Sequence, residues 1–214
     1  MNYWDLNVII IKNWYSLSLI SETLNHLSQV KIFIKLDIIF AFNCFWIKEE
    51  DEAFIVFHTW FELFKYLVML FNLCNELISF QKYINNTLHK HLNKFCITYL
   101  NDILIYSNNE LEHEIYVKLI LQKLQEADFQ MNIIKYKFHV TQVLYLELII
   151  IIKEIKMNSF KINIIVNWFT LINVKNVQSF LNFTNFYKRF IYDYSRITNS
   201  LTRLIKKIEL FVWS

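Results

Sequence analysis

The sequence lacks glycine and proline altogether over its 214 residues. Average usage of about 7% and about 5% would give roughly 15 glycines and roughly 11 prolines in a chain of this length. Glycine normally occupies turns and helix ends because it alone enters positive φ without steric cost. We therefore expect asparagine to replace glycine there, with some backbone strain. The abundant Ile, Asn, Lys, Phe and Tyr have A/T-rich codons, so biased mutation explains this composition better than selection for a fold.

Cysteine and long apolar runs are also scarce. The three cysteines, Cys44, Cys74 and Cys96, lie far apart and form no CxxC pair, which predicts neither a zinc site nor a disulfide framework. The most apolar window, 144–155, contains three charged residues and is shorter than the roughly 20 residues of a spanning helix. We expect no membrane segment and no signal peptide, and an intracellular location, cytoplasmic or nuclear, is the default expectation.

No charge sign dominates the chain. It holds 22 Lys and Arg against 19 Asp and Glu, a formal net charge of +3, which permits a nucleic-acid partner without arguing for one. An apolar fraction of 55% supplies enough core for one substantial domain or two small ones. The chain is therefore expected to be globular.

Residue patterns predict an α+β fold without linkers or repeats. Helices are expected at 17–27, 75–92, 109–127 and 174–191. Strands are expected at 31–37, within 53–68 as one or two strands, at 95–107 as a hairpin, and at 138–152 as a second hairpin. The segment 161–168 fits either a short helix or a strand.

The clearest helical pattern is 109–127. Asn109 and Glu112 resemble a capping box at its start. Its expected buried face consists of Leu111, Ile115, Leu119 and Leu124. For 75–92, the expected cap is Asn75 and the expected apolar face is Leu77, Phe80, Ile84 and Leu88.

The stretch 95–107, FCITYLNDILIYS, contains two β-prone runs separated by Asn101 and Asp102, which favour tight turns. A carboxylate at the tip of an apolar hairpin is held where it can meet a ligand. A lone Asp in a turn is more often only a turn former, and Asp37 at the end of the strand 31–37 is equally ambiguous. The residues alone leave both interpretations open.

Five sequence blocks occur in a recognisable order. They are KLD at 35–37 with Ala41-Phe42 beyond it, YLVM at 66–69, FNLCNELISFQ at 71–81, YLNDILIYS at 99–107 and FLNFTNFYKRFI at 180–191. This succession resembles the reverse transcriptase of gypsy-type long-terminal-repeat retrotransposons over nearly the whole chain. The resemblance implies a right-hand polymerase, with fingers and palm in 1–160 and a thumb or connection region in 161–214. It also implies that the ribonuclease H and integrase domains of a parent polyprotein are absent from this chain.

The resemblance implies RNA-directed DNA synthesis, in which two Mg²⁺ ions assist nucleotidyl transfer to a primer 3′-hydroxyl. The implied partners are an RNA or DNA template with its primer, and deoxynucleoside triphosphates, held largely through phosphate contacts and shape. The implied site residues are as follows: Asp37, Asn101 and Asp102 are catalytic, with Asp37 and Asp102 as metal ligands; Phe42, Gln81 and the loop 71–75 line the nucleotide and template site; and Tyr145, Leu146 and Glu147 form the turn that grips the primer.

Departures from the family pattern bear on activity. The family's hairpin reads Tyr-x-Asp-Asp, but its first carboxylate position is Asn101 here, which brings no formal charge to a metal. Six positions where the family usually has glycine hold other residues: Asp5, Glu50, Glu62, Asn72, Glu147 and Asn182.

Most of these changes can be reached by G·C to A·T transitions. We therefore predict a decayed copy whose polymerase activity is lost or strongly reduced. The alternatives are a non-catalytic nucleic-acid-binding remnant and a translated relic that hardly folds.

Overall fold

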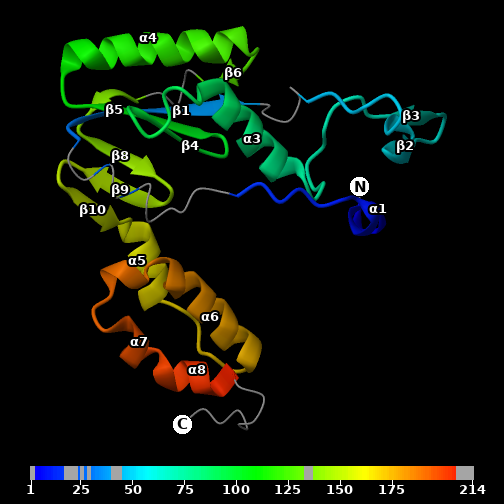
Figure 1. Ribbon diagram of the computed structural model, residues 1–214. Coiled ribbons are helices and arrows are strands. Elements are labelled where there is room, and N and C mark those ends of the chain that lie inside the picture. Colours follow the sequence, from blue (N-terminus) through cyan, green and yellow to red (C-terminus); the bar gives the residue numbers. More distant parts are fainter. Residues whose placement is uncertain are drawn as a thin grey trace. The chain divides into compact units, whose positions relative to one another are not determined.

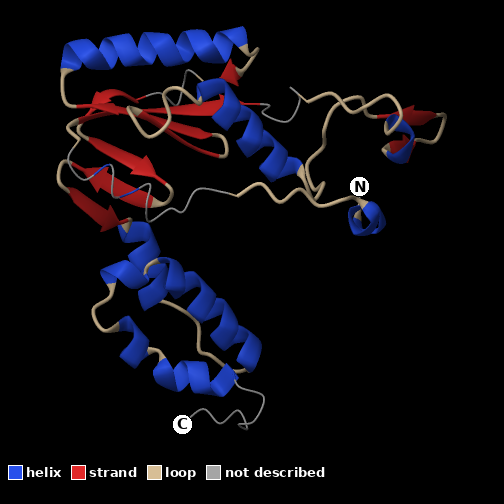
Figure 2. Ribbon diagram, viewed as in Figure 1, coloured by secondary structure: helices blue, strands red, loops and turns tan. Residues whose placement is uncertain are grey.

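The computed structural model describes residues 3–16, 24, 27, 30–39, 45–132 and 137–205 (Figure 1). The chain divides into two compact units, the first comprising 1–145 and 150–154 and the second 146–149 and 155–214. The expected boundary after residue 160 would fall within helix α5 (Ser159–Val166). Helices and antiparallel strands both contribute, as an α+β fold requires (Figure 2).

The main sheet of the first unit has five antiparallel strands. Its strands are β1 (Ile32–Ile39), β4 (Cys96–Tyr99), β5 (Asp102–Ser107), β6 (Gln130–Met131) and β7 (Lys137–Val140). Their order is β4-β5-β1-β6, and β7 also pairs with β1. The hairpin expected at 95–107 is therefore confirmed as β4 and β5, with β5 lying directly against β1.

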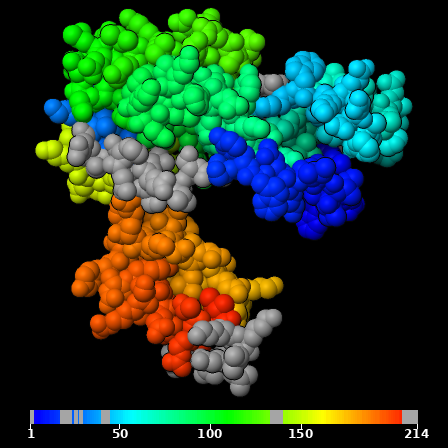
Figure 3. Space-filling model, viewed as in Figure 1, coloured from blue at the N-terminus to red at the C-terminus, as the bar shows by residue number. Residues whose placement is uncertain are grey.

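Two helices bury one face of this sheet: α3 (Glu76–Leu88) and α4 (Glu110–Glu126). The alternation of β1 sends Ile34, Leu36 and Ile38 into the core that these helices share with the sheet. Each fully buried side chain of this size contributes about 1.5–3 kcal/mol relative to exposure. In the space-filling view the green atoms, which include those of α3 and α4, form one continuous surface (Figure 3).

The buried face of α4 differs from the predicted one. Leu111 and Ile115 are 73% and 62% exposed, so their assignment to the core was wrong. The buried stripe is instead His113, Val117, Ile120 and Leu124. Both stripes have helical spacing, and the one containing histidine can face inward because Nδ1 of His113 lies 3.0 Å from the Ser107 hydroxyl, which gives that ring nitrogen a hydrogen-bond partner.

The face expected for α3 is confirmed at Phe80, Ile84 and Leu88, which are fully buried, but Leu77 is 47% exposed. Asn75 precedes the helix without a side-chain capping bond. Its side chain instead accepts from Asn13 N and donates to the carbonyl oxygen of Ile11, each at 2.8 Å. The N-terminal segment, with α1 at Trp4–Ile9, is thereby attached to the start of α3.

Asparagine caps the other long helices. Asn109 accepts from Leu111 N at the start of α4, and Asn158 accepts from Phe160 N at the start of α5. Asn173 does the same for α6 (Val174–Phe186). These bonds satisfy backbone N–H groups of the first helical turn, which have no acceptor within the helix.

A separate antiparallel pair lies between β1 and α3 in sequence. It consists of β2 (Val56–His58) and β3 (Leu63–Lys65), preceded by the short helix η2 (Glu52–Phe54). The expectation of one or two strands within 53–68 is confirmed.

A three-stranded sheet follows along the chain, with its strands in the order β10-β9-β8. Its strands are β8 (Gln142–Tyr145), β9 (Leu148–Ile151) and β10 (Glu154–Met157). The second predicted hairpin, 138–152, is confirmed as β8 and β9, whereas its first residues belong to β7 and pair with β1.

The remainder of the second unit is helical. The segment 161–168, for which helix and strand were both open, is helical in α5 up to Val166. The helix expected at 174–191 ends at Phe186 in α6 and is followed by η4 (Lys188–Phe190). The chain continues into α7 (Tyr194–Ile197) and α8 (Asn199–Ile205), which packs against α6.

Eight non-glycine residues of the described chain have positive φ: Asn72, Asn93, Leu100, Asp128, Leu146, Glu147, Lys153 and Asp193. The prediction that asparagine replaces glycine in turns is confirmed at two of them. Leucine, glutamate and lysine occupy others, where a left-handed conformation costs about 1–2 kcal/mol per residue. Of the six positions where the family usually has glycine, only Asn72 and Glu147 are strained in this way.

Two predicted features lie largely or wholly outside the described residues. Of the expected helix 17–27, only Leu24 and Leu27 are described in its apolar stripe, and both are buried. Phe42 is not described. Among the helices that are described, none combines the length and apolarity needed to cross a membrane.

Candidate active site

The register of β1 and β5 brings Asp37 and Asp102 together. The two residues are direct partners in this antiparallel pair, so their side chains leave the same face of the sheet. Side chains of directly opposed residues have Cβ atoms about 4.5–5.5 Å apart. Ile38 N also donates a hydrogen bond to the carbonyl oxygen of Asn101 at 2.9 Å, which ties the turn before β5 to β1. Two carboxylates that are far apart in sequence thus meet where β5 begins beside β1.

The turn of the hairpin consists of Leu100 and Asn101, because Tyr99 pairs directly with Asp102. The prediction that Asp102 is a turn residue was wrong, since it is the first residue of β5. Leu100 has φ 51°, a conformation that glycine usually supplies in two-residue hairpin turns. Because Asp102 belongs to the strand, the pleat of β5 fixes the direction of its side chain.

Gln81 holds this strained turn in place. It is 1% exposed, and its Oε1 accepts from Leu100 N at 2.7 Å. Its Nε2 donates to Thr98 Oγ1 at 3.2 Å and to Asn85 Oδ1 at 2.8 Å. Gln81 therefore supports the hairpin from α3, and the nucleotide contact that the resemblance implies for it stays a prediction.

A lysine neutralises part of the charge of this site. Lys35 Nζ lies 2.8 Å from Asp102 Oδ2, and the two side chains are 29% and 25% exposed. Such a pair is screened only in part by solvent. Lys35 belongs to the KLD block, but no role was predicted for it. The alternation of β1 was a usable signal, because it places Lys35 and Asp37 on the same face.

Tyr145 of β8 lies fully buried near the carboxylates. Burial raises the pKa of its hydroxyl well above the usual value, and the negative charge of Asp102 raises that pKa further. Tyr145 therefore remains neutral. Within the described chain its buried hydroxyl oxygen has no hydrogen-bond partner.

The side chains around the paired carboxylates have the type of ligand atom that a hard divalent cation prefers. The atoms of Asp37, Asn101 and Asp102 that can bind a metal are oxygens, which Mg²⁺ prefers. The Oδ1 atom of Asn101 is buried without a hydrogen-bond partner among the described residues, as an acceptor left for a cation would be. The described residues contain no group of three or more His, Cys, Asp or Glu side chains that could hold a metal. These three positions thus fit a metal ion by donor type, with less negative charge than three carboxylates would bring.

The predicted primer-gripping turn joins β8 to β9. Leu146 and Glu147 have φ values of 50° and 65°, and Glu147 is one of the positions where the family usually has glycine. Positive φ at both central residues is typical of a type I′ turn. Glu147 Oε2 also lies 2.7 Å from Lys161 Nζ, a contact that raises the lysine pKa. Glu147 is exposed in this turn, and contact of the turn with a primer stays a prediction.

The loop 71–75 is held from two sides. Asn72 N donates to the buried carboxylate of Glu76 at 2.7 Å. From the N-terminal segment, the amide of Asn7 donates to the Asn72 carbonyl oxygen and accepts from Cys74 N. The sequence analysis missed Asn7, because nothing local marks a contact with a loop 65 residues away.

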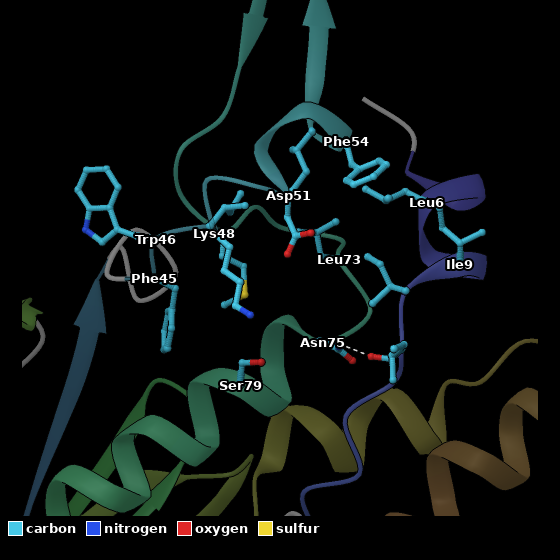
Figure 4. A pocket seen from close by; sticks show the side chains of 15 residues that line it. Leu6, Ile9, Phe45, Trp46, Lys48, Asp51, Phe54, Leu73, Asn75 and Ser79 are labelled. Carbon is cyan, nitrogen blue, oxygen red and sulfur yellow. Dashed lines mark hydrogen bonds between the residues drawn. The ribbon is translucent and has the colours of Figure 1, made fainter.

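This loop also borders a largely apolar pocket of about 620 Å³ in the first unit (Figure 4). Leu73, Asn75 and Ser79 line one side, and residues from 6–11 and 45–55 complete the wall. Neither the two carboxylates nor Asn101 lines it. The pocket is therefore distinct from the carboxylate pair, although the predicted template and nucleotide loop contributes to it.

Comparison with known proteins supports one family. Residues 1–150 match the family model described as reverse transcriptase (RNA-dependent DNA polymerase). The chain is 32% identical over 206 residues to the retrovirus-related Pol polyprotein from transposon opus of Drosophila melanogaster, covering 96% of this chain and 20% of that protein. It is 32% identical over 214 residues to the transposon Tf2-3 polyprotein of Schizosaccharomyces pombe, covering 100% of this chain and 16% of that one. The chain thus spans about a fifth or less of these relatives.

Solved structures show the same fold. A foamy viral protease-reverse transcriptase in complex with double-stranded DNA superimposes with a TM-score of 0.85 at 19% identity, covering 100% of this chain and 45% of that chain. The foamy viral enzyme in complex with an RNA/DNA hybrid gives a TM-score of 0.82 at 19% identity, covering 100% and 29%. The predicted right-hand polymerase fold is confirmed, and with residues 1–150 matching the family model, this chain belongs to the reverse transcriptase (RNA-dependent DNA polymerase) family.

Proposed function

We propose that this chain is the reverse-transcriptase domain of a gypsy-type retrotransposon polyprotein, and that polymerase activity in this copy is lost or strongly reduced. Its curated relatives are transposon polyproteins that are about five or more times longer. Ribonuclease H and integrase domains would belong to such a parent protein. Cytoplasmic or nuclear location follows from the same proposal.

The observation that carries the proposal is the direct pairing of Asp37 with Asp102 beside the turn residue Asn101. Closely spaced oxygen donors on a rigid sheet hold a cation without reorganisation at the moment of reaction. Bound Mg²⁺ would activate the primer 3′-hydroxyl and stabilise the leaving pyrophosphate. Asp37 and Asp102 would hold such ions: the pleat of β5 fixes the direction of Asp102, β1 fixes that of Asp37, and Gln81 holds the turn between β4 and β5.

Loss of activity follows from the charge of this site. The proposed ligands comprise two negative carboxylates and one neutral amide, and Lys35 offsets the negative charge of Asp102. Each tenfold loss of rate needs only about 1.4 kcal/mol of transition-state stabilisation. The missing third carboxylate therefore costs orders of magnitude in rate.

The proposed ligands are a template paired with a primer, and deoxynucleoside triphosphates. The foamy viral relatives were solved with an RNA/DNA hybrid and with double-stranded DNA, which supports this class of partner. The proposed contacts with the nucleotide and template are made by Phe42, Gln81 and the loop 71–75. The proposed contact with the primer is made by the turn of Leu146 and Glu147.

A second function, nucleic-acid binding without synthesis, is favoured by one specific observation. The change that removes catalytic charge is at Asn101, while the sheet and the helices behind it form a continuous buried core. A surface that binds nucleic acid can therefore be retained after polymerase activity is lost. Binding of primer-template that weakens with salt, without extension, would identify this function.

Primer extension on an RNA template with Mg²⁺ tests the main proposal. The chain as given is expected to extend a primer at a rate near background. Robust synthesis would overturn the proposed inactivity. Failure of Asp37→Asn to abolish any synthesis that is seen would overturn the assignment of the site itself.

A further inference from the structure

We propose that Lys35 competes with the divalent cation for the Asp102 carboxylate, so that the ammonium group acts as an internal substitute for the metal. This inference rests on the proposed function, because the cation site is the one proposed for polymerase chemistry. It adds a role for a residue of the KLD block that the family resemblance left without one.

The strand register gives Lys35 this position. Lys35 and Asp37 lie on one face of β1, where their partners on β5 are Leu104 and Asp102. Lys35 reaches diagonally across the two strands and places Nζ 2.8 Å from Asp102 Oδ2. Lys35 thus occupies one of the two oxygen atoms that Asp102 could offer to a metal ion.

The electrostatics favour such a substitution. Like charges directly opposite each other on two strands destabilise a sheet. A lysine ammonium relieves this repulsion for Asp102, because it only donates hydrogen bonds and carries a full charge. Asp37, Asp102 and Lys35 together carry a formal charge of −1, and Asn101 and the neutral Tyr145 add none. A divalent ion therefore meets a site that is already half neutralised.

Direct Mn²⁺ binding, measured by electron paramagnetic resonance of the free ion, tests the inference without relying on activity. The measurement compares Lys35→Met, which removes the charge at similar length, with Lys35→Arg, which retains it. Lys65→Met is a matched control, because Lys65 pairs with Glu52 away from the site. Each variant is made in the given chain and in an Asn101→Asp background, and thermal unfolding in EDTA confirms that each is folded.

Removing one nearby positive charge is expected to tighten Mn²⁺ binding about tenfold in Lys35→Met, whereas Lys35→Arg and Lys65→Met stay within about twofold of their parent. Unchanged or weaker binding in folded Lys35→Met would overturn the competition while leaving the metal site in place. Absence of Mn²⁺ binding in every chain at millimolar metal, or binding that is unaffected by Asp102→Asn, would overturn the proposed metal site and the competition with it.

Discussion

The two tight hairpins of this chain adopt positive φ without glycine, and they differ in how that strain is supported. In the β4-β5 hairpin only Leu100 has positive φ, and the buried Gln81 bonds to its backbone nitrogen. In the β8-β9 hairpin both Leu146 and Glu147 have positive φ, and the contact made by the Glu147 side chain is an ion pair with Lys161 in which Glu147 is 56% exposed. Exposed ion pairs contribute little, and buried hydrogen bonds are costly to lose. Strain in the first turn is offset by tertiary support, whereas strain in the second is largely uncompensated.

The largest expected effect combines repairs to both hairpins. Asn101→Asp restores the third carboxylate and Glu147→Gly relieves the second turn. We expect the double variant to extend primers about 100-fold faster than the given chain, since about 2.7 kcal/mol of transition-state stabilisation suffices for that factor. Asn101→Asp alone is expected to restore little. Single-turnover primer extension measures both.

Asp37→Asn in the double variant serves as the control, because it removes a proposed metal ligand while retaining side-chain size. It should return extension to background. Equal extension by Asn101→Asp and by the double variant would contradict the view that the second turn limits activity.

The support of the first hairpin can be removed directly. Gln81→Leu leaves the Leu100 backbone nitrogen without its buried acceptor and is expected to lower the free energy of unfolding by about 2–3 kcal/mol. Urea denaturation followed by circular dichroism measures this. Gln122→Leu is the control, since Gln122 is exposed on α4 and bonds only to Glu126 among the described contacts. Equal effects of the two substitutions would refute a special role for Gln81.

Relief of the second hairpin should appear as added stability. Glu147→Gly is expected to raise the free energy of unfolding by about 1 kcal/mol, because glycine adopts φ near 65° without steric cost. Asn182→Gly is the matched control: this position also usually holds glycine in the family, but here it lies within α6, where glycine weakens a helix. Thermal unfolding should therefore shift in opposite directions for the two. A shift in the same direction would contradict the comparison.

The smallest expected effect concerns pH. Burial lowers the pKa of His91, and the charges of Lys94, Lys123 and Lys90 lower it further. Because the folded pKa lies below the unfolded value near 6.5, the stabilising contribution is complete above that value and is lost as pH falls through the folded pKa. His91 packs on Phe95 just before β4, so the loss should act on the first hairpin.

Hydrogen exchange of β4 and β5 between pH 7 and pH 5 checks this prediction, after correction for the intrinsic exchange rate. The parent should lose protection on acidification, and His91→Asn should lose less. His89→Asn is the control on the same loop. Indistinguishable pH profiles for parent and His91→Asn would rule out the effect.

Much of the fold was predictable because its signals are local. β-prone runs around Asn101 identified the first hairpin, and apolar spacing identified α3, α4 and α6. The buried face of α4 was not predictable from spacing, because two stripes compete and the choice depends on the contact of His113 with Ser107, six residues earlier, which forms only once α4 has packed on β5. The same limit applies to Gln81, whose support of the turn arises only when α3 packs behind β4.

The sequence alone predicted where the site lies: the order of the motif blocks implied that Asp37 and Asp102 meet, which their direct pairing confirms, and it singled out Asn101 as the position that lacks the carboxylate of the family pattern. Composition also predicted that residues other than glycine would occupy left-handed turns. The tertiary structure alone decided where Lys35 reaches, because a diagonal contact between strands depends on register, and register is set by the whole sheet. It also decided which of the positions that usually hold glycine in the family are strained here, since φ at each position depends on the turn that the surrounding strands and helices impose.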